Sequence, residues 1–287
     1  MSGAIHRGRA WLGHGLNAPL LLAGVAIVVY AAFFASLYDM RVLTLAGVYA
    51  ILVLGYQFVF GHAGALSLAQ GAFFGLGAYA TGILGSLWGV GFQLTFPFSI
   101  LVPGVVAALI AAPVLRLESH YFALATLAFS QAVLLLAVNW ESVTGGANGL
   151  PGVPGVRLFG EGIGAGAPLL LFVWVWVALG AVIARRAMRG LYGQSFAVMR
   201  AAPLAAGTLG IDTGMLRYTA FVLSALYAGG AGALYVHTIR VVSPEVLGFG
   251  VMVICLTMTV VGGRTTVAGA LVGALLLTHL PEWFRAL

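Results

Sequence analysis

The chain has 287 residues, of which 62% are hydrophobic and only 7% are charged, and its formal net charge is +6. Its mean hydropathy is +1.08. Because about 25% of the residues in a typical soluble domain are charged, this composition excludes a soluble domain and predicts a membrane protein. We expect membrane lipid around it and no nucleic-acid partner. The single cysteine, Cys255, excludes a disulfide framework.

Long stretches without charged residues are candidate membrane spans, because a helix needs about 20 apolar residues to cross the hydrocarbon. Such stretches cover residues 10–38, 42–115, 119–140, 162–184, 218–239, 246–263 and 265–281. The stretch 42–115 is too long for one helix, and we expect residues 61–64, and residues 89–91 with Pro97, to divide it into three. The sequence therefore predicts an all-α polytopic transmembrane bundle of about eight to nine passes, some of them broken or re-entrant. We expect residues 1–287 to form one permease domain.

The arginines set the orientation, because cytoplasmic loops retain positive charge during insertion. If residues 185–217 are cytoplasmic, alternation of the spans puts nine of the 13 basic residues on that side: Arg7, Arg9, Arg116, Arg185, Arg186, Arg189, Arg200, Arg217 and Arg264. Five of the seven acidic residues then fall on the other side. We expect a cytoplasmic N-terminus, and we interpret residues 19–38 as a span because they lack the cleavage site of a signal peptide.

Several kinds of chemistry lack the residues that they need. All basic residues are arginine, so the chain has no Walker lysine for nucleotide phosphates. The acids lie at predicted span ends, whereas an ion-coupled carrier usually buries a carboxylate in mid-membrane. His237 and His279 also lie near span ends, where a lone histidine is more often structural than a proton relay. No pattern indicates a metal site or a nucleophile with its base, so we expect no catalytic residues and no cofactor in this chain.

The segment 185–217 is a cluster of arginines in a nearly uncharged protein, which suggests a handle for something outside the membrane. Its alanine-rich centre favours a short helix, and Gly210 can supply the left-handed residue that ends it. Its sequence resembles the cytoplasmic helix by which ABC importer permeases dock on their ATPases. The resemblance implies a coupling role for Gly193, Ser195, Met199, Arg200, Ala205, Ala206, Gly210 and Ile211.

The resemblance extends in order along the chain, through residues 61–79, 121–129, 139–150, 220–225, 231–235, 243–245 and 261–264. Taken together, these segments resemble the LivM-type permease of the branched-chain amino acid ABC importer family. This resemblance implies a bacterial inner-membrane protein with three kinds of partner. They are ABC ATPase subunits that bind ATP and Mg, a second related permease chain, and a periplasmic or lipid-anchored solute-binding protein. One departure is that Ala201, Ala202 and Pro203 stand where relatives usually carry acidic residues.

The resemblance implies a small amphipathic substrate, most often leucine, isoleucine or valine. Related permeases take urea, short amides or aromatic acids, and nothing in the sequence discriminates between them. A self-sufficient secondary transporter or channel and a membrane enzyme are the alternative classes. The acid distribution speaks against the former, and the latter lacks a catalytic constellation.

Glycines four apart, Gly71 with Gly75 and Gly269 with Gly273, predict helix faces that let backbones approach closely. Polar residues near the first pair, Ser67, Gln70 and Tyr79, together with Thr126, are candidates for the translocation path.

The loop 139–166 is predicted to be external, and its glycine and proline content indicates turns without regular structure. It is long for a connector, and long loops are often functional. We expect it at the outer mouth, with Glu141, Thr144, Asn148, Glu161 and Glu245 as candidate contacts of the binding protein.

Overall fold

The computed structural model describes residues 36–117, 119–158 and 161–285. Its elements follow one another as α3 (Leu37–Tyr56), η1 (Gln57–His62), α4 (Gln70–Gly82), η2 (Ile83–Leu87), α5 (Phe92–Val114), α6 (Ser119–Asn139), α7 (Glu141–Thr144), η3 (Gly146–Asn148), β1 (Leu150–Pro151), β2 (Arg157–Leu158), β3 (Glu161–Gly162), α8 (Ala167–Ala187), α9 (Leu191–Ala201), α10 (Pro203–Thr208), α11 (Thr213–Ile239), β4 (Val241–Val242), η4 (Pro244–Leu247), α12 (Phe249–Gly262) and α13 (Val267–Arg285).

Six helices of the described residues are long and apolar enough to cross a membrane: Leu37–His62, Phe92–Val114, His120–Asn139, Ala167–Ala187, Thr213–Ile239 and Val267–Phe284. Two shorter segments, α4 with η2 and α12, occupy the third and eighth predicted passes. The all-α polytopic bundle is therefore confirmed. The first predicted pass, 10–38, lies almost wholly outside the described residues.

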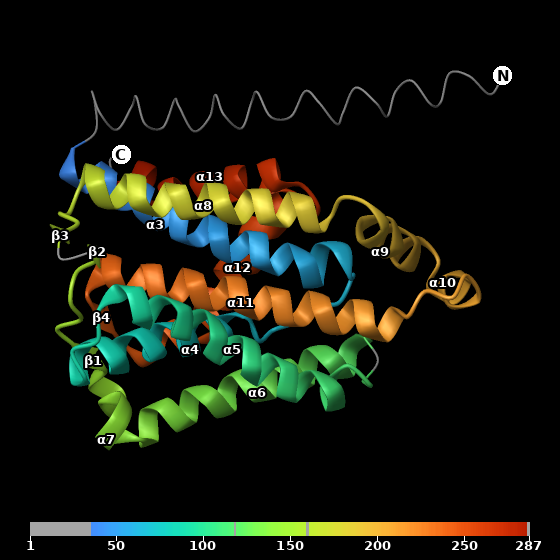
Figure 1. Cartoon of the computed structure of the whole chain (residues 1–287), viewed down its shortest axis with the longest axis horizontal. Helices are drawn as coiled ribbons and strands as arrows, with labels where there is room; N and C mark the ends of the chain where they lie inside the picture. The colour runs from blue at the N-terminus through green and yellow to red at the C-terminus, as the bar shows by residue number, and fades with distance from the viewer. Residues whose placement is uncertain (1–35, 118, 159–160, 286–287) are drawn as a thin grey trace.

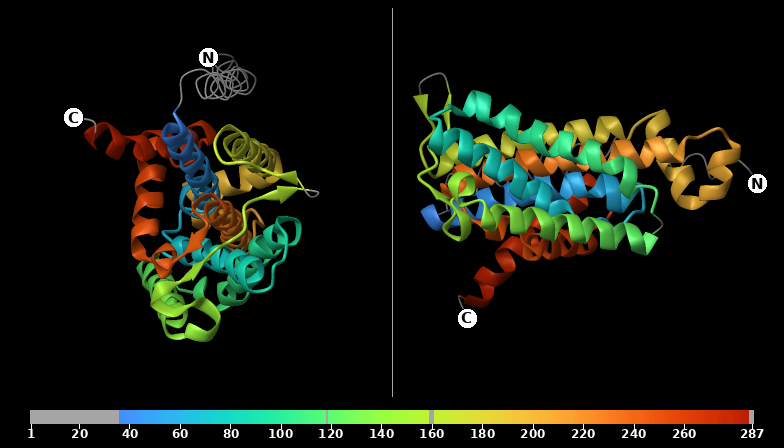
Figure 2. Two further views of the ribbon diagram at one scale, coloured as in Figure 1. Left: turned by 90° about the vertical axis from the view of Figure 1, so that its left-hand side faces the viewer. Right: turned by 90° about the horizontal axis from the view of Figure 1, so that it is seen from below.

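Two central helices organise the bundle. In the most apolar window of the α3 span 89% of the residues are buried, against 22% in the α6 span. The central helix α11 packs against α3, α4 and α5, whereas α8 and α13 pack against α3. The view along the bundle shows α3 and α11 in the middle and the other helices around them (Figure 2).

Local sequence explains several helix ends. Ser36 and Asp39 form a capping box at the start of α3, and the Asp212 side chain accepts the backbone N–H of Met215 at the start of α11. The predicted breaks at residues 61–64 and 89–91 are confirmed. Pro97 was wrongly assigned to the second break, because it lies inside α5; neighbouring helices in a bundle can satisfy the backbone that a proline leaves free.

The bundle has two distinct ends (Figure 1). At one end, the α9–α10 end, the short helices α9 and α10 extend beyond the spans. These two helices together form the projection. The opposite end, the β-strand end, holds two small antiparallel sheets. In one of them β1 pairs with β4, with Leu150 opposite Val242. In the other, β2 pairs with β3, with Arg157 opposite Gly162.

Candidate functional site

The projection at the α9–α10 end consists of two short helices between α8 and α11. Gly190, with φ +80°, precedes α9, and Gly210, with φ +74°, follows α10. The backbone N–H of Ile211 reaches back to the carbonyl of Ala206 at 3.1 Å, which closes the turn. The expected left-handed helix end at Gly210 is confirmed, and Ala202 separates two helices where the sequence suggested one.

The structure places the predicted coupling residues on different faces of this projection. The side chains of Met199 and Ala206 are buried, and Arg200 and Gly210 are exposed. Ser195 donates to the carbonyl of Leu191 in its own helix. Gly193 and Ile211 are half-buried, and the Ala205 side chain lies outside the described atoms. That these residues contact an ATPase stays a prediction.

A contact between α9 and η1, the segment that continues α3, anchors the projection to the bundle. Arg200 donates from Nη1 to the carbonyl oxygen of Gly61 at 3.1 Å. Next to this bond, the buried ring of Phe196 lies 6.3 Å from the His62 ring, centroid to centroid. Sequence reasoning missed Phe196 and His62, because no local pattern shows that residues more than 130 positions apart meet.

The segment η1 (Gln57–His62), which contains Gly61 and His62, also holds the turn between α12 and α13. The side-chain amide of Gln57 donates to the carbonyls of Gly263 and Thr266 at 2.8 and 3.0 Å. The Arg264 guanidinium lies over the Phe60 ring at 5.3 Å. Because η1 is a π-helical turn, a form that is frequent at functional sites, we regard it as the junction between the projection and the bundle.

Three of the four predicted path residues have their polar groups bonded inside the protein. Gln70 donates to the carbonyls of Leu52 and Ser224 at 3.3 and 3.4 Å and accepts from the Ser224 hydroxyl at 2.7 Å. Thr126 accepts the backbone N–H of Leu68 at 2.9 Å, and the Ser67 hydroxyl accepts that of Ala69. These side chains join helices in the conformation described, and their place on a path stays a prediction.

Tyr79 differs from the other three candidates. It is 5% exposed, and its hydroxyl has no hydrogen-bond partner. It lies on α4, nine positions after Gln70 and nearer the β-strand end, where Gly82 at the end of α4 approaches Val242 of β4.

Two segments without regular helix lead into short helices inside the bundle. Residues 63–69 lead into α4, and residues 240–248, which include β4 and η4, lead into α12. A Cβ at Gly71 would lie 3.0 Å from the carbonyl oxygen of Gly248, and one at Gly75 would overlap the Leu247 side chain. The starts of α4 and α12 therefore meet, and the close approach predicted for Gly71 and Gly75 is confirmed.

The second glycine pair is also packed as expected. A Cβ at Gly269 would overlap the carbonyl oxygen of Gly262, and one at Gly273 would overlap that of Met258. These contacts hold α12 directly against α13.

The loop 139–166, which was predicted to be external, is more ordered than its composition suggested. The expectation of a loop without regular structure is wrong, because residues 139–166 contain α7, η3 and the strands β1, β2 and β3. The partners come from a distant part of the chain: Val153 donates its N–H to the carbonyl of Arg240, and the Pro154 carbonyl lies 2.9 Å from Nδ1 of His237. Tertiary pairing thus replaces the solvent bonds expected of an isolated loop.

The predicted contacts of this loop divide into two groups. Glu141, Asn148, Glu161 and Glu245 are exposed. Thr144 is buried, and its hydroxyl bonds to the carbonyls of Ala137 and Trp140. Four of the five side chains are therefore accessible to a partner, and Thr144 shapes the loop. No group of three or more metal-ligating side chains occurs among the described residues.

Comparisons with known proteins cover almost all of the chain. A family described as "Branched-chain amino acid transport system / permease component" matches residues 39–287. The high-affinity branched-chain amino acid transport system permease protein LivM of Salmonella typhimurium is 30% identical over 92% of this chain and 68% of its own length. LivM of Escherichia coli gives the same identity and coverage. No solved structure matches the chain.

Proposed function

Because the chain belongs to the family of permease components of branched-chain amino acid transport systems, we propose that it is the transmembrane subunit of an ABC importer. It moves a small amphipathic solute, leucine, isoleucine or valine, across the bacterial inner membrane. Separate ATPase subunits supply the work, and a soluble or lipid-anchored binding protein supplies the solute. A second related permease chain completes the path.

The observation that carries this proposal is the anchored projection at the α9–α10 end. Short helices outside the spans expose Leu191, Tyr192 and Leu209, and a groove in a partner can grip such side chains. The same projection is bonded to η1 through Arg200 and Gly61. A partner that displaces α9 therefore displaces the end of a central span.

The orientation supports a cytoplasmic position for this projection. Within the described residues, the ends of helices and turns on this side carry Arg116, Arg185, Arg186, Arg189, Arg200, Arg217 and Arg264, whereas the β-strand end carries Arg41, Arg157, Arg240 and Arg285. The excess of arginine follows the positive-inside rule. We infer that the N-terminus is also cytoplasmic, because the predicted alternation of spans puts it on the same side of the membrane as this projection.

The mechanism follows from the contacts of η1. Closure of the partner ATPases moves α9, and the Arg200–Gly61 bond and the packed Phe196 transmit this movement to η1. From η1 the movement has two routes: along the chain into residues 63–69, and through Gln57 to the α12–α13 turn. Both routes lead to the point where α4 and α12 meet. Rigid-body displacement of packed helices then exchanges outward- and inward-facing states.

The β-strand end fits a docking surface for the binding protein. Its exposed Glu141, Glu161 and Glu245 can pair with basic side chains of that partner. Because β1 pairs with β4, the loop is joined to the segment that leads into α12. Docking at the loop therefore acts on the same short helix that the ATPases reach from the other side.

The test is reconstitution with and without the partners. We expect the chain, its partner permease and the ATPases to co-purify and to accumulate radiolabelled leucine in vesicles when ATP and the binding protein are present. An ATPase partner with its Walker lysine replaced is the matched control. Accumulation of leucine by this chain alone, driven by an ion gradient, would contradict the proposal. Accumulation of urea or an aromatic acid but not of leucine would contradict only the substrate.

A further inference from the structure

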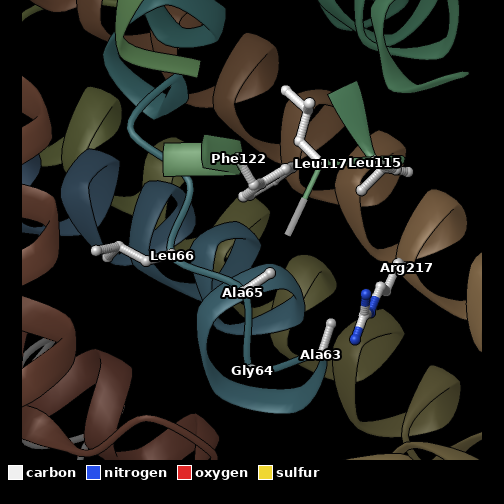
Figure 3. A pocket seen from close by; sticks show the side chains of 8 residues that line it. All are labelled: Ala63, Gly64, Ala65, Leu66, Leu115, Leu117, Phe122 and Arg217. Carbon is white, nitrogen blue, oxygen red and sulfur yellow. The ribbon is translucent and has the colours of Figure 1, made fainter. Parts of the chain in front are cut away.

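A cavity of about 220 Å³ opens near the α9–α10 end of the bundle. It lies between the segment after η1, residues 115–117 after α5, Phe122 of α6 and the start of α11 (Figure 3). Its lining consists of Ala63, Gly64, Ala65, Leu66, Leu115, Leu117, Phe122 and Arg217. Among these eight residues Arg217 carries the only charge, and the other side chains are apolar.

Arg217 has hydrogen-bonding capacity to spare. Its Nε is buried and has no hydrogen-bond partner, and the described residues give the side chain no ion pair. In Figure 3 the guanidinium extends from α11 toward Ala63. A buried donor without a hydrogen-bond partner in the protein is costly, more so on a charged group, so an oxyanion that enters the cavity gains a partner that is already in place.

We propose that this cavity binds the transported amino acid on its way out, with Arg217 pairing with the α-carboxylate. This inference rests on the proposed function. The planar guanidinium matches a carboxylate with two parallel hydrogen bonds. The leucine and phenylalanine side chains of the lining accept a branched aliphatic group. The cavity is smaller than the roughly 300–1,000 Å³ of drug-sized sites, which suits a small solute.

The position of the cavity supports an exit site. Its floor is residues 63–66, which follow η1 directly and lead into α4. Gly64 has φ +70°, and a Cβ there would meet no atom within 4 Å, so backbone lines the cavity at this point. Movement of η1 therefore moves the floor of the cavity, and the solute is released where the coupling helices act.

The test is protection of a cysteine reporter in the assembled transporter. Leu117→Cys puts an accessible thiol in the lining, and the native Cys255 is wholly buried. We expect L-leucine to slow maleimide labelling of this chain in phosphatidylcholine nanodiscs. 4-Methylpentanoate, which keeps the carboxylate, also protects, and L-leucinamide, which lacks it, does not. The control reporter is Met215→Cys, an exposed position on α11 two residues before Arg217, and protection there would overturn the site.

Variants of Arg217 test the role of its charge and shape. We expect Arg217→Gln to raise the leucine concentration needed for protection by about tenfold, the equivalent of about 1.4 kcal/mol. Arg217→Lys keeps the charge without the planar fork and gives an intermediate effect. Protection that is unchanged in Arg217→Gln, or equal protection by leucinamide, overturns the proposal.

Other sources of an oxyanion are separate arms of the experiment. Equal protection by inorganic phosphate, or slower labelling in nanodiscs that contain phosphatidylglycerol, assigns the cavity to a general anion or a lipid headgroup and overturns the substrate assignment. The same purified transporter, reconstituted in sealed vesicles, is assayed for ATP-driven leucine accumulation. Accumulation without protection refutes the exit site alone, and the absence of both refutes the proposed function with it.

Discussion

Gly61→Ala tests the junction at η1. A Cβ at this position would overlap the carbonyl oxygen of Arg264. Because the obstacle is backbone, no side-chain rotation relieves it, and the α12–α13 turn must move away. That turn is held by two hydrogen bonds from Gln57, so the displacement works against the contacts that join η1 to the turn.

Overpacking of this kind costs about 1–3 kcal/mol. By the scaling for chains of 150–250 residues, such a loss lowers the apparent melting temperature by roughly 2–12 °C. We also expect the Arg200–Gly61 bond to lengthen, so that the reconstituted importer hydrolyses ATP but moves less leucine per ATP. A loss of about 1.4 kcal/mol in the coupling step corresponds to about tenfold less transport.

The assay compares Gly61→Ala with Gly250→Ala, measuring melting in detergent and leucine uptake per ATP in vesicles. Gly250 lies in α12 with no atom within 4 Å of its added Cβ, so alanine there leaves melting unchanged or raises it. Equal melting and equal coupling in the two variants would refute the assignment of η1 as the junction.

Three further substitutions test the projection, the core and the loop. Gly210→Val forces a β-branched residue into φ +74°, a strain of about 1–3 kcal/mol; we expect lost uptake with normal membrane insertion, while Gly210→Asn, which tolerates this φ, retains uptake. Gln70→Glu places a carboxylate oxygen against the carbonyls of Leu52 and Ser224; melting should fall further than in Gln70→Met, and the reverse order would contradict the hydrogen-bond assignment. Thr144→Val leaves the N–H of Gly146 without the hydroxyl, a cost of about 1–3 kcal/mol, so proteolysis of the loop should accelerate, whereas Asn148→Ala leaves it unchanged.

Glycine patterns made several local features predictable from the sequence. The breaks at residues 61–64 and 89–91, the helix end at Gly210 and the close contacts of Gly71 and Gly273 all follow from the absence of a side chain. Each of these features depends on a residue and its immediate surroundings. These local features can therefore be predicted from each segment of the sequence taken by itself.

The functional contacts were not predictable in the same way. The bonds from Arg200 to Gly61 and from Ser224 to Gln70 join residues 139 and 154 positions apart. Each depends on the register between two helices, which no local periodicity records. The external loop shows the same limit, because β1 acquires its regular structure from β4, ninety positions later in the chain.

The short helix α12 explains how one movement can reach the centre of the bundle. With 14 residues and a rise of about 1.5 Å per residue, it is roughly 21 Å long. Gln57 of η1 donates to the carbonyl of Gly263, which follows the last turn of α12. Gly248, which precedes the first turn, lies against Gly71 at the start of α4. Because a packed helix transmits displacement along its length, movement of η1 by the projection reaches the point where the two short helices meet. Gly61 against the Arg264 carbonyl and Gly71 against the Gly248 carbonyl keep backbone close to backbone near both ends of α12, so little of this movement is lost to side-chain rearrangement.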